Sequence, residues 1–238
     1  MAGETVKAEA ICLGIHPWSQ TSHIVSWLTP AGRVSTVVKG AMRPKSFFLG
    51  QYDLNYTCEI LYYARGKGDV HALREAMPLE MREGLRSDFR ALAMAGYFRR
   101  LAGDLAPAGE ECRAWYRLLG EALDDLACRP ADAVGRLCRL LVFELDVLKL
   151  AGLAPDFSGY DPGAEWSAFG VESGSFDAGE GGRRVRISRE VAKFLANPKT
   201  PLDNLKIPLD AARVIGVFYQ FHLDCALDVR RSVLKLIS

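Results

Sequence analysis

Residues 16–46 have the sequence HPWSQTSHIVSWLTPAGRVSTVVKGAMRPKS. Two runs within it, Ser22–Thr29 and residues 33–38, are rich in β-branched and apolar residues and predict β-strands. Pro30 and Gly32 lie between the two runs, and a proline followed closely by a glycine is typical of a tight turn. The stretch therefore predicts a β-hairpin, around which the rest of the N-terminal region is organised.

The segment that follows the hairpin is basic. Residues 39–46 contain Lys39, Arg43 and Lys45, while Gly40 and Pro44 disfavour any regular secondary structure there. A basic loop on a rigid hairpin suits contact with nucleic-acid phosphates, because lysine and arginine extend into solvent. The alternative is a solvated loop whose charges only keep the protein soluble.

Three further strand candidates occupy residues 6–13, 53–63 and 70–77. Residues 6–13 alternate weakly, and residues 54–63 are rich in apolar and β-branched residues at a period near two. Five short antiparallel strands fit a small closed barrel, because closure removes the exposed edges that such strands would otherwise present. We therefore expect an OB-fold domain over residues 1–80.

The apolar period becomes helical from residue 78 onward. Leu85, Phe89 and Leu92 share one face of a predicted first helix, and Gly96 continues that face. A second amphipathic helix follows, with apolar residues at i, i+3, i+4, i+7 and i+11 from Trp115.

The predicted third helix is apolar almost all round. We expect Asp132 to cap its N-terminus and the helix to end at Gly152. Because the helix has only a narrow polar stripe, we expect it to lie at the centre of a helical core. Residues 155–187 are rich in glycine, serine and aspartate and predict a hairpin excursion, which we expect Trp166 and Phe176 to hold by packing.

Two more helices complete a helical domain over residues 81–238. Ser188 predicts the cap of a short helix, and the last helix is expected to begin near Leu209 with a buried stripe from Val214 to Cys225. The chain as a whole is thus expected to be an α+β protein with an N-terminal barrel and a mainly helical second domain.

Composition excludes several classes of protein. The 238 residues carry a formal net charge of only +1, so an anionic partner would have to meet a local basic patch. Six scattered cysteines without a C-x-x-C pair favour reduced thiols in a cytoplasm over a disulfide framework. The N-terminal residues MAGETVKAEA have no apolar core, and we expect no signal peptide and no membrane helix.

Motifs for catalysis are lacking in the sequence. The four histidines have no metal-ligand spacing, and the chain has no phosphate-binding G-x-x-x-x-G-K-[ST] loop and no nucleophile elbow. Paired acids such as Asp124 and Asp125 fit a solvated helix face. We therefore expect a protein that is not an enzyme.

Three aromatic residues follow the basic loop: Phe47, Phe48 and Tyr52. They could stack on unpaired bases, but aromatic side chains in such a position more often close the end of a barrel. We favour the core role.

The hairpin resembles the N-terminal domain of the bacterial RecO family. The resemblance includes the strand end at Leu28-Thr29, the turn at Gly32 and the sequence Val-Lys-Gly-Ala at residues 38–41. Further matches follow in register: Gly50-Gln51 before residues 53–63, Gly66-Lys67-Gly68 before residues 70–77, and LAGLAPDF at residues 150–157. The resemblance covers most of the chain and depends on this ordered series.

The resemblance implies the same OB-fold and a role in DNA repair and recombination. It implies binding of single- and double-stranded DNA, annealing of complementary strands, and, with RecR, loading of RecA onto DNA coated by single-stranded DNA-binding protein. It also implies a bacterial cytoplasmic protein that joins the nucleoid when bound to DNA. Members of the family often hold a structural zinc with two C-x-x-C pairs in the excursion, but residues 155–187 contain no cysteine, so we expect no cofactor.

Two sets of residues are the candidate binding sites. The cations expected to form one DNA-binding face are Arg33, Lys39, Arg43, Lys45, Arg65 and Lys67. The arginines expected to receive the acidic tail of the single-stranded DNA-binding protein, because arginine pairs with carboxylates, are Arg113, Arg117, Arg136 and Arg139. The alternative for the second set is a solvated helix face.

Two other functions compete with this interpretation. One is an OB-fold adaptor whose main ligand is a protein and whose DNA binding is incidental. The other is an enzyme that acts on nucleic acid. A steep salt dependence of DNA affinity would favour direct DNA binding over the adaptor, and an assay with and without magnesium would test the enzyme.

Overall fold

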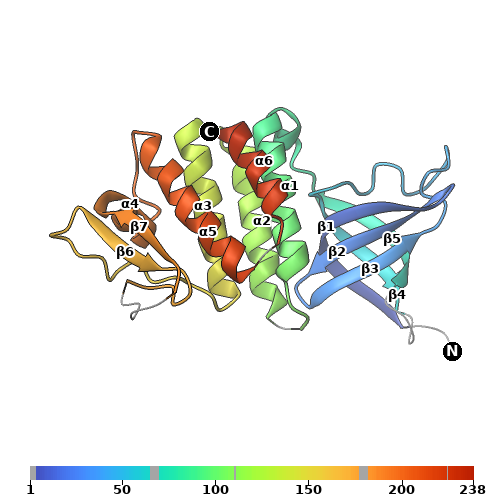
Figure 1. Ribbon diagram of the computed structural model, residues 1–238. Helices are drawn as coiled ribbons and strands as arrows, with labels where there is room; N and C mark the ends of the chain where they lie inside the picture. Colours follow the sequence, from blue (N-terminus) through green and yellow to red (C-terminus); the bar gives the residue numbers. More distant parts are fainter. Residues whose placement is uncertain (1–3, 65–69, 110, 177–181, 224) are drawn as a thin grey trace. The chain divides into compact units, whose positions relative to one another are not determined.

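The computed structural model describes residues 4–64, 70–109, 111–176, 182–223 and 225–238, and Figure 1 shows their arrangement. The chain divides into two compact units, residues 1–128 and residues 129–238.

The first unit begins with a closed barrel of five strands, which confirms the expected OB-like fold (Figure 1). The strands are β1 (Thr5–Ser19), β2 (Ser22–Thr29), β3 (Gly32–Val38), β4 (Thr57–Tyr63) and β5 (Val70–Glu80). They close in the order β1-β2-β3-β5-β4. Four of the neighbouring pairs are antiparallel, whereas β3 and β5 run parallel, so the expectation that all strands are antiparallel was wrong at this seam.

The inside of the barrel is filled by alternate residues of its strands. Trp27 is fully buried, and its indole N–H donates a hydrogen bond of 2.8 Å to the hydroxyl of Thr36, also fully buried. This bond satisfies the one polar atom of the indole, which would otherwise make its burial costly. Ala41, Phe48 and Tyr52 from the connection between β3 and β4 pack against the same core.

Two helices complete the first unit, after a single turn η1 (Glu83–Arg86): α1 (Phe89–Leu105) and α2 (Cys112–Cys128). The side chain of Asp88 caps α1 by accepting hydrogen bonds from two backbone N–H groups. The predicted shared face is wrong, because Leu85 lies in η1, while Phe89 and Leu92 in the first turn of α1 are exposed. Met94, Phe98 and Leu101, among others, form the buried face instead.

The second unit consists of helices and a two-stranded sheet (Figure 1). Its elements are α3 (Ala133–Leu150), β6 (Trp166–Gly170), β7 (Arg184–Ser188), α4 (Arg189–Ala196), α5 (Lys206–His222) and α6 (Leu227–Ile237). The predicted caps Asp132 and Ser188 are confirmed by side-chain hydrogen bonds to the backbones of α3 and α4. The prediction that the helix from Leu209 is the last was wrong, since α6 follows it.

A buried ion pair joins three helices of this unit. Glu144 on α3 is fully buried, and its carboxylate accepts hydrogen bonds of 2.6 and 2.9 Å from Arg230 on α6. Arg230 also donates to the carbonyl of Ala212 on α5. Six apolar residues of α3 are buried as predicted, among them Leu137, Leu140 and Leu141, which are fully buried.

None of the helices in the described ranges is both long and apolar enough to cross a lipid bilayer.

Candidate nucleic-acid interface

The basic loop after β3 is a succession of tight turns tied to a neighbouring hairpin. Gly40 adopts a left-handed φ of 70°, which glycine tolerates without strain, and its carbonyl accepts the N–H of Arg43. The backbone N–H of Met42 donates to the carbonyl of Thr21, in the turn between β1 and β2, at 3.0 Å. Gly40 donates to the hydroxyl of Ser22 at 3.3 Å. The loop is therefore fixed to the β1–β2 turn.

All three cations of this loop, Lys39, Arg43 and Lys45, are exposed. Met42 between them is also exposed, whereas Ala41 points into the barrel core. The loop thus buries one small side chain and presents its charges to solvent from a fixed backbone, the arrangement that phosphate contacts require.

Trp18 lies at the same end of the sheet as the basic loop, two strands away, and the sequence did not single it out. The pairing of β1 with β2 shifts register between Pro17 and Ser19, so Trp18 occupies a β-bulge, and its side chain is 66% exposed. Pro17 pairs with His23, which pairs with Val38, so Trp18 lies about two strand spacings, or ~10 Å, from the start of the basic loop. No sequence pattern marks the bulge, because it arises from the pairing of two strands.

The aromatic residues after the loop divide between core and surface. Tyr52 packs edge-on against Trp27 and lies 2.9 Å from Nδ1 of His23, and burial raises the pKa of its phenol to about 12. Phe48 packs on the barrel core as well, so the favoured core role is confirmed for these two. Phe47 is 71% exposed and lies next to the charges of the loop.

The other predicted DNA-binding cations are placed differently. Arg33 is six positions from Lys39, near the opposite end of β3, about 20 Å away at the usual rise of a strand. Its guanidinium donates to the carbonyl of Gly103 on α1. Arg65 and Lys67 lie outside the described residues, so their contribution stays a prediction.

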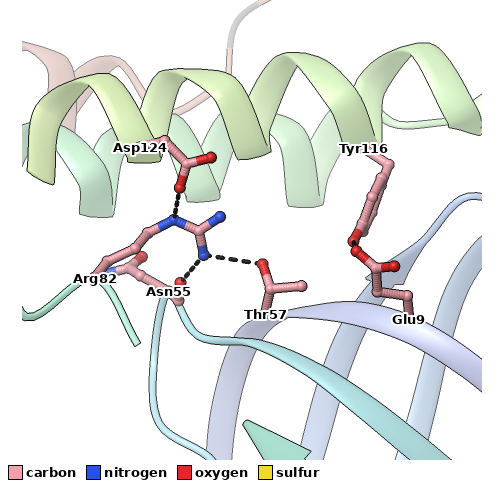
Figure 2. A network of polar contacts seen from close by, with 6 residues as sticks. All are labelled: Glu9, Asn55, Thr57, Arg82, Tyr116 and Asp124. Atoms are coloured by element: carbon pink, nitrogen blue, oxygen red, sulfur yellow. Dashed lines mark hydrogen bonds and ion pairs between the residues drawn. The ribbon is translucent and has the colours of Figure 1, made fainter. Parts of the chain in front are cut away.

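A network of hydrogen bonds around Arg82 connects the barrel to α2 (Figure 2). Arg82 is 4% exposed and donates to the carbonyl of Asn55, the hydroxyl of Thr57 and the carboxylate of Asp124, at 2.6, 2.9 and 2.7 Å. Its backbone is left-handed, with φ 51°, where the chain leaves β5. The network holds α2 against β4 and so keeps the barrel in one arrangement with its helices.

A second contact runs parallel to it. The hydroxyl of Tyr116 on α2 donates to the carboxylate of Glu9 on β1 at 2.6 Å (Figure 2). Burial and this carboxylate both raise the pKa of the phenol. Tyr116 is therefore a neutral donor at any physiological pH.

The barrel interior contains two cysteines without the character of a nucleophile. Cys12 and Cys58 are fully buried, and burial raises the pKa of Cys58 to about 12. Burial also raises the pKa of Cys12. Both stay protonated near neutral pH, and thiols are weak nucleophiles in that form.

The four arginines predicted to bind a protein tail lie in both units. Arg113 and Arg117 are exposed on α2, beside a buried Trp115. Arg136 and Arg139 are half-buried on α3, where their guanidinium groups donate to the carbonyls of Ala131 and Arg129 before the helix. The apolar neighbours that were expected to line a groove there are fully buried: Leu137, Leu140 and Leu141. The predicted site remains without an open apolar surface on α3.

An open groove of about 480 Å³ lies instead between α5 and α6. Leu209, Val217 and Leu234 are among its apolar lining, and Arg213, Arg231 and Lys235 are among its cations. Arg213 also pairs with Asp210 at 2.7 Å.

Family comparisons agree with this architecture. The signature described as Recombination protein O N terminal matches residues 1–82, which include the barrel. The signature described as Recombination protein O C terminal matches residues 86–231. The chain belongs to the RecO family. The resemblance found in the hairpin and the basic loop is thereby confirmed.

Three individual relatives share at most about a third of their aligned residues with this chain. The chain is 30% identical over 150 residues to the DNA repair protein RecO of Moorella thermoacetica, covering 63% of this chain and 54% of that protein. It is 30% identical over 156 residues to the protein of the same name from a Roseiflexus species, covering 65% and 53%. For Alkaliphilus metalliredigens the identity is 26% over 152 residues, covering 63% and 59%. The matches thus span little more than half the length of these RecO proteins.

The structural zinc site that the family resemblance implies for residues 155–187 does not fit this chain. Residues 155–187 supply neither cysteine nor histidine, the side chains that hold structural zinc. Where the structure describes this excursion, ring contacts hold it: Phe169 stacks on Phe157 at 4.8 Å between centroids and meets Phe176 edge-on at 5.3 Å.

Proposed function

We propose that this protein is a recombination mediator of DNA repair that binds single- and double-stranded DNA through the basic loop of its barrel. One observation carries the proposal: Lys39, Arg43 and Lys45 are exposed on a loop that is hydrogen-bonded to the β1–β2 turn, and the exposed Trp18 lies on β1 about 10 Å from the start of this loop. Membership of the RecO family supports the same role.

The proposed mechanism requires no catalytic residue. Two complementary strands repel each other through their phosphates, and cations on a fixed loop lower this repulsion by replacing counterions. A base stacked on Trp18 would hold one strand unpaired while the other approaches. Annealing follows from neutralisation and positioning, so we propose a protein that is not an enzyme.

Charge reversal of the loop tests this proposal. The triple variant Lys39→Glu, Arg43→Glu, Lys45→Glu should lower affinity for an oligonucleotide and reduce the slope of log affinity against log salt by about three contacts' worth. The measurement is fluorescence anisotropy of labelled single strands and duplexes at several salt concentrations.

The matched control reverses three exposed arginines elsewhere in the first unit: Arg74, Arg90 and Arg100. The control changes net charge by the same amount, so a specific loop predicts a much smaller loss than the triple variant shows. Equal losses in both variants would mean that only overall charge matters, and an unchanged affinity of the folded triple variant would remove the loop from the site.

The protein partners are proposed on the family resemblance. They are RecR, RecA in its filament, and the single-stranded DNA-binding protein, in the bacterial cytoplasm. An acidic tail ending in an apolar residue would find apolar walls and three cations in the groove between α5 and α6. We therefore place the tail there in preference to Arg136 and Arg139 on α3.

A peptide titration separates the two tail sites. Arg231→Ala with Lys235→Ala should weaken binding of an acidic tail peptide, whereas Arg136→Ala with Arg139→Ala should leave it near the parent value. The reverse result would return the site to α3. If DNA affinity of the full chain shows little salt dependence while the peptide binds tightly, the protein is an adaptor and the DNA-binding proposal fails.

A further inference from the structure

The two-stranded sheet of the second unit has one buried face and one exposed face. Phe169 on β6 and Ile187 on β7 point inward and are 1% exposed each. Ala168 pairs with Arg186, and these residues lie on the opposite face, where both are exposed. Side chains two positions apart on a strand share a face, so Trp166 joins Ala168 there.

Trp166 was expected to hold the excursion by packing, and this expectation was wrong. Its side chain is 48% exposed, and the buried Phe169 makes the ring contacts that hold the sheet, with Phe157, Phe176 and Phe218. Trp166 contacts a cation instead, since the guanidinium carbon of Arg186 lies 5.4 Å from the centre of its ring. A half-exposed indole beside an arginine is thus a surface feature of this sheet.

Further cations surround this pair. Arg184 lies two positions before Arg186 on the same face of β7, and Arg183 and Arg189 flank the strand, all of them exposed. Residues 183–189 thus contain four arginines and no acidic residue, although Glu165 and Glu190 stand just outside the two strands. The ring contacts of the sheet lie on its other face, and Arg189 donates to the carbonyl of Pro162 at 3.2 Å.

We propose that the outward face of β6 and β7 is a second binding surface for single-stranded nucleic acid. An unpaired base stacks on the indole of Trp166, and Arg184 and Arg186 contact the phosphates on either side of it. Stacking on an aromatic ring needs an unstacked, unpaired base, which a duplex does not offer. Guanidinium groups suit phosphate oxygens because they donate two parallel hydrogen bonds.

This surface is independent of the basic loop, which belongs to the other unit. It requires neither Lys39 nor Arg43 nor Lys45, and it would bind nucleic acid even if the barrel did not. Its failure and the failure of the proposed function are therefore separable, because each unit has its own exposed tryptophan.

The test uses those tryptophans. The chain has four, of which Trp27 and Trp115 are buried, so only Trp18 and Trp166 are accessible to a stacking base. The full chain with Trp18→Phe reports on Trp166 alone among the exposed indoles, and the chain with Trp166→Phe reports on Trp18. Each variant is titrated with oligothymidylate of about twenty nucleotides at low salt while tryptophan fluorescence is followed.

We expect fluorescence quenching in the Trp18→Phe protein, and its loss when Trp166→Phe is added. In the Trp18→Phe background, Arg184→Glu with Arg186→Glu should weaken the affinity reported by Trp166 roughly tenfold and lower its salt slope by about two. The matched control reverses two exposed lysines of the same unit, Lys149 and Lys206, and should leave most of the affinity intact.

Three results would overturn the proposal. The Trp18→Phe protein could bind the oligonucleotide by anisotropy without any quenching, or the arginine reversal could do no more than the lysine control while circular dichroism shows a folded chain. Alternatively, polyglutamate could quench Trp166 as strongly as oligothymidylate, which would make the face a site for acidic proteins. Loss of the Trp18 signal alone would count against the barrel loop and leave this surface standing.

Discussion

Each unit has a buried arginine at the centre of a polar network, and the two arginines have different partners. Arg82 belongs to the first unit and Arg230 to the second. Arg230 is 6% exposed and pairs with Glu144, whose side chain is fully buried. Arg82 is 4% exposed, but its carboxylate partner Asp124 is 54% exposed, and its other two acceptors are the neutral oxygens of Asn55 and Thr57.

This difference sets what each network contributes. A sealed ion pair has lost the solvation of both charges, so either charge left alone is strongly destabilising. A half-exposed carboxylate keeps much of its water and contributes little by itself, whereas a buried guanidinium still needs its hydrogen bonds. The second unit thus depends on a charge pair, and the first on a multiply bonded donor.

Removal of the buried carboxylate should have the largest effect. Glu144→Ala leaves the guanidinium of Arg230 buried without its counter-charge, and we expect the free energy of unfolding to fall by about 3–5 kcal/mol. Urea unfolding followed by circular dichroism measures the loss, and hydrogen exchange should show weakened protection in α3.

The double variant Glu144→Leu, Arg230→Met is the control, because it removes both charges and keeps apolar volume. It should recover much of the loss. A Glu144→Ala protein within about 1 kcal/mol of the parent would mean that water reaches the pair, and the contrast with Arg82 would disappear.

The Arg82 network should respond unequally to removal of its two ends. Arg82→Ala leaves the carbonyl of Asn55 and the hydroxyl of Thr57 without their donor, and should cost about 2–4 kcal/mol. Asp124→Asn removes only the exposed charge and should cost less than about 1 kcal/mol. Equal losses from the two variants, measured by the same urea unfolding, would show that the loss comes from the ion pair and not from the acceptors that Arg82→Ala leaves unpaired.

These networks also mark the limit of what the sequence predicts. The barrel strands, the caps Asp132 and Ser188 and the basic loop follow from local patterns, which depend on neighbours in the chain. The two ion pairs depend instead on how the helices and strands pack. Arg82 and Asp124 are 42 positions apart in the sequence, and Arg230 and Glu144 are 86 positions apart. No local period encodes them.

The candidate sites show the same division. The exposure of the loop cations could be predicted from Gly40 and Pro44, which exclude regular structure. The bulge at Trp18 could not, since it arises from the pairing of two strands. Trp166 was expected to hold the excursion by packing, but four phenylalanines already form the ring contacts there. The sequence shows that several aromatic residues lie in this excursion, but it does not show which of them will be exposed to solvent.

A smaller effect is expected at the glycine that faces Arg230. A β-carbon at Gly216 on α5 would lie 2.6 Å from Nη1 of that arginine, so Gly216→Ala should displace the ion pair and lower the free energy of unfolding by about 1–3 kcal/mol. Gly96→Ala on α1 is the matched control, because no atom lies within 4 Å of the added carbon. There the better helix propensity of alanine should raise stability by about 0.5–1 kcal/mol. Thermal unfolding of the two variants should therefore shift in opposite directions, and a stabilised Gly216→Ala protein would show that Arg230 moves freely.

The smallest effect concerns two tyrosines, Tyr219 in the network of Arg230 and Tyr116 beside the network of Arg82. Tyr219 donates to the carbonyl of Glu144 at 2.8 Å, and burial, followed by the charge of Glu144, raises the pKa of its phenol well above 10. The folded protein therefore keeps this proton while the unfolded chain releases it above about pH 10, so stability falls as pH rises through that range. Between pH 9 and pH 11 this phenol alone should remove about 1.4 kcal/mol from the free energy of unfolding.

Tyr219→Phe should remove that part of the pH dependence and cost about 1–2 kcal/mol at pH 8, because it leaves a buried carbonyl without its donor. Tyr116→Phe should cost less, since its partner Glu9 is open to water and can be solvated instead. The comparison needs urea unfolding of the three proteins at pH 8, 9 and 11. Because the pKa of both phenols is raised, both variants should flatten the alkaline fall, and the two networks should differ in the cost at pH 8. Equal costs at pH 8 would mean that Glu9 is no more open to water than the carbonyl of Glu144.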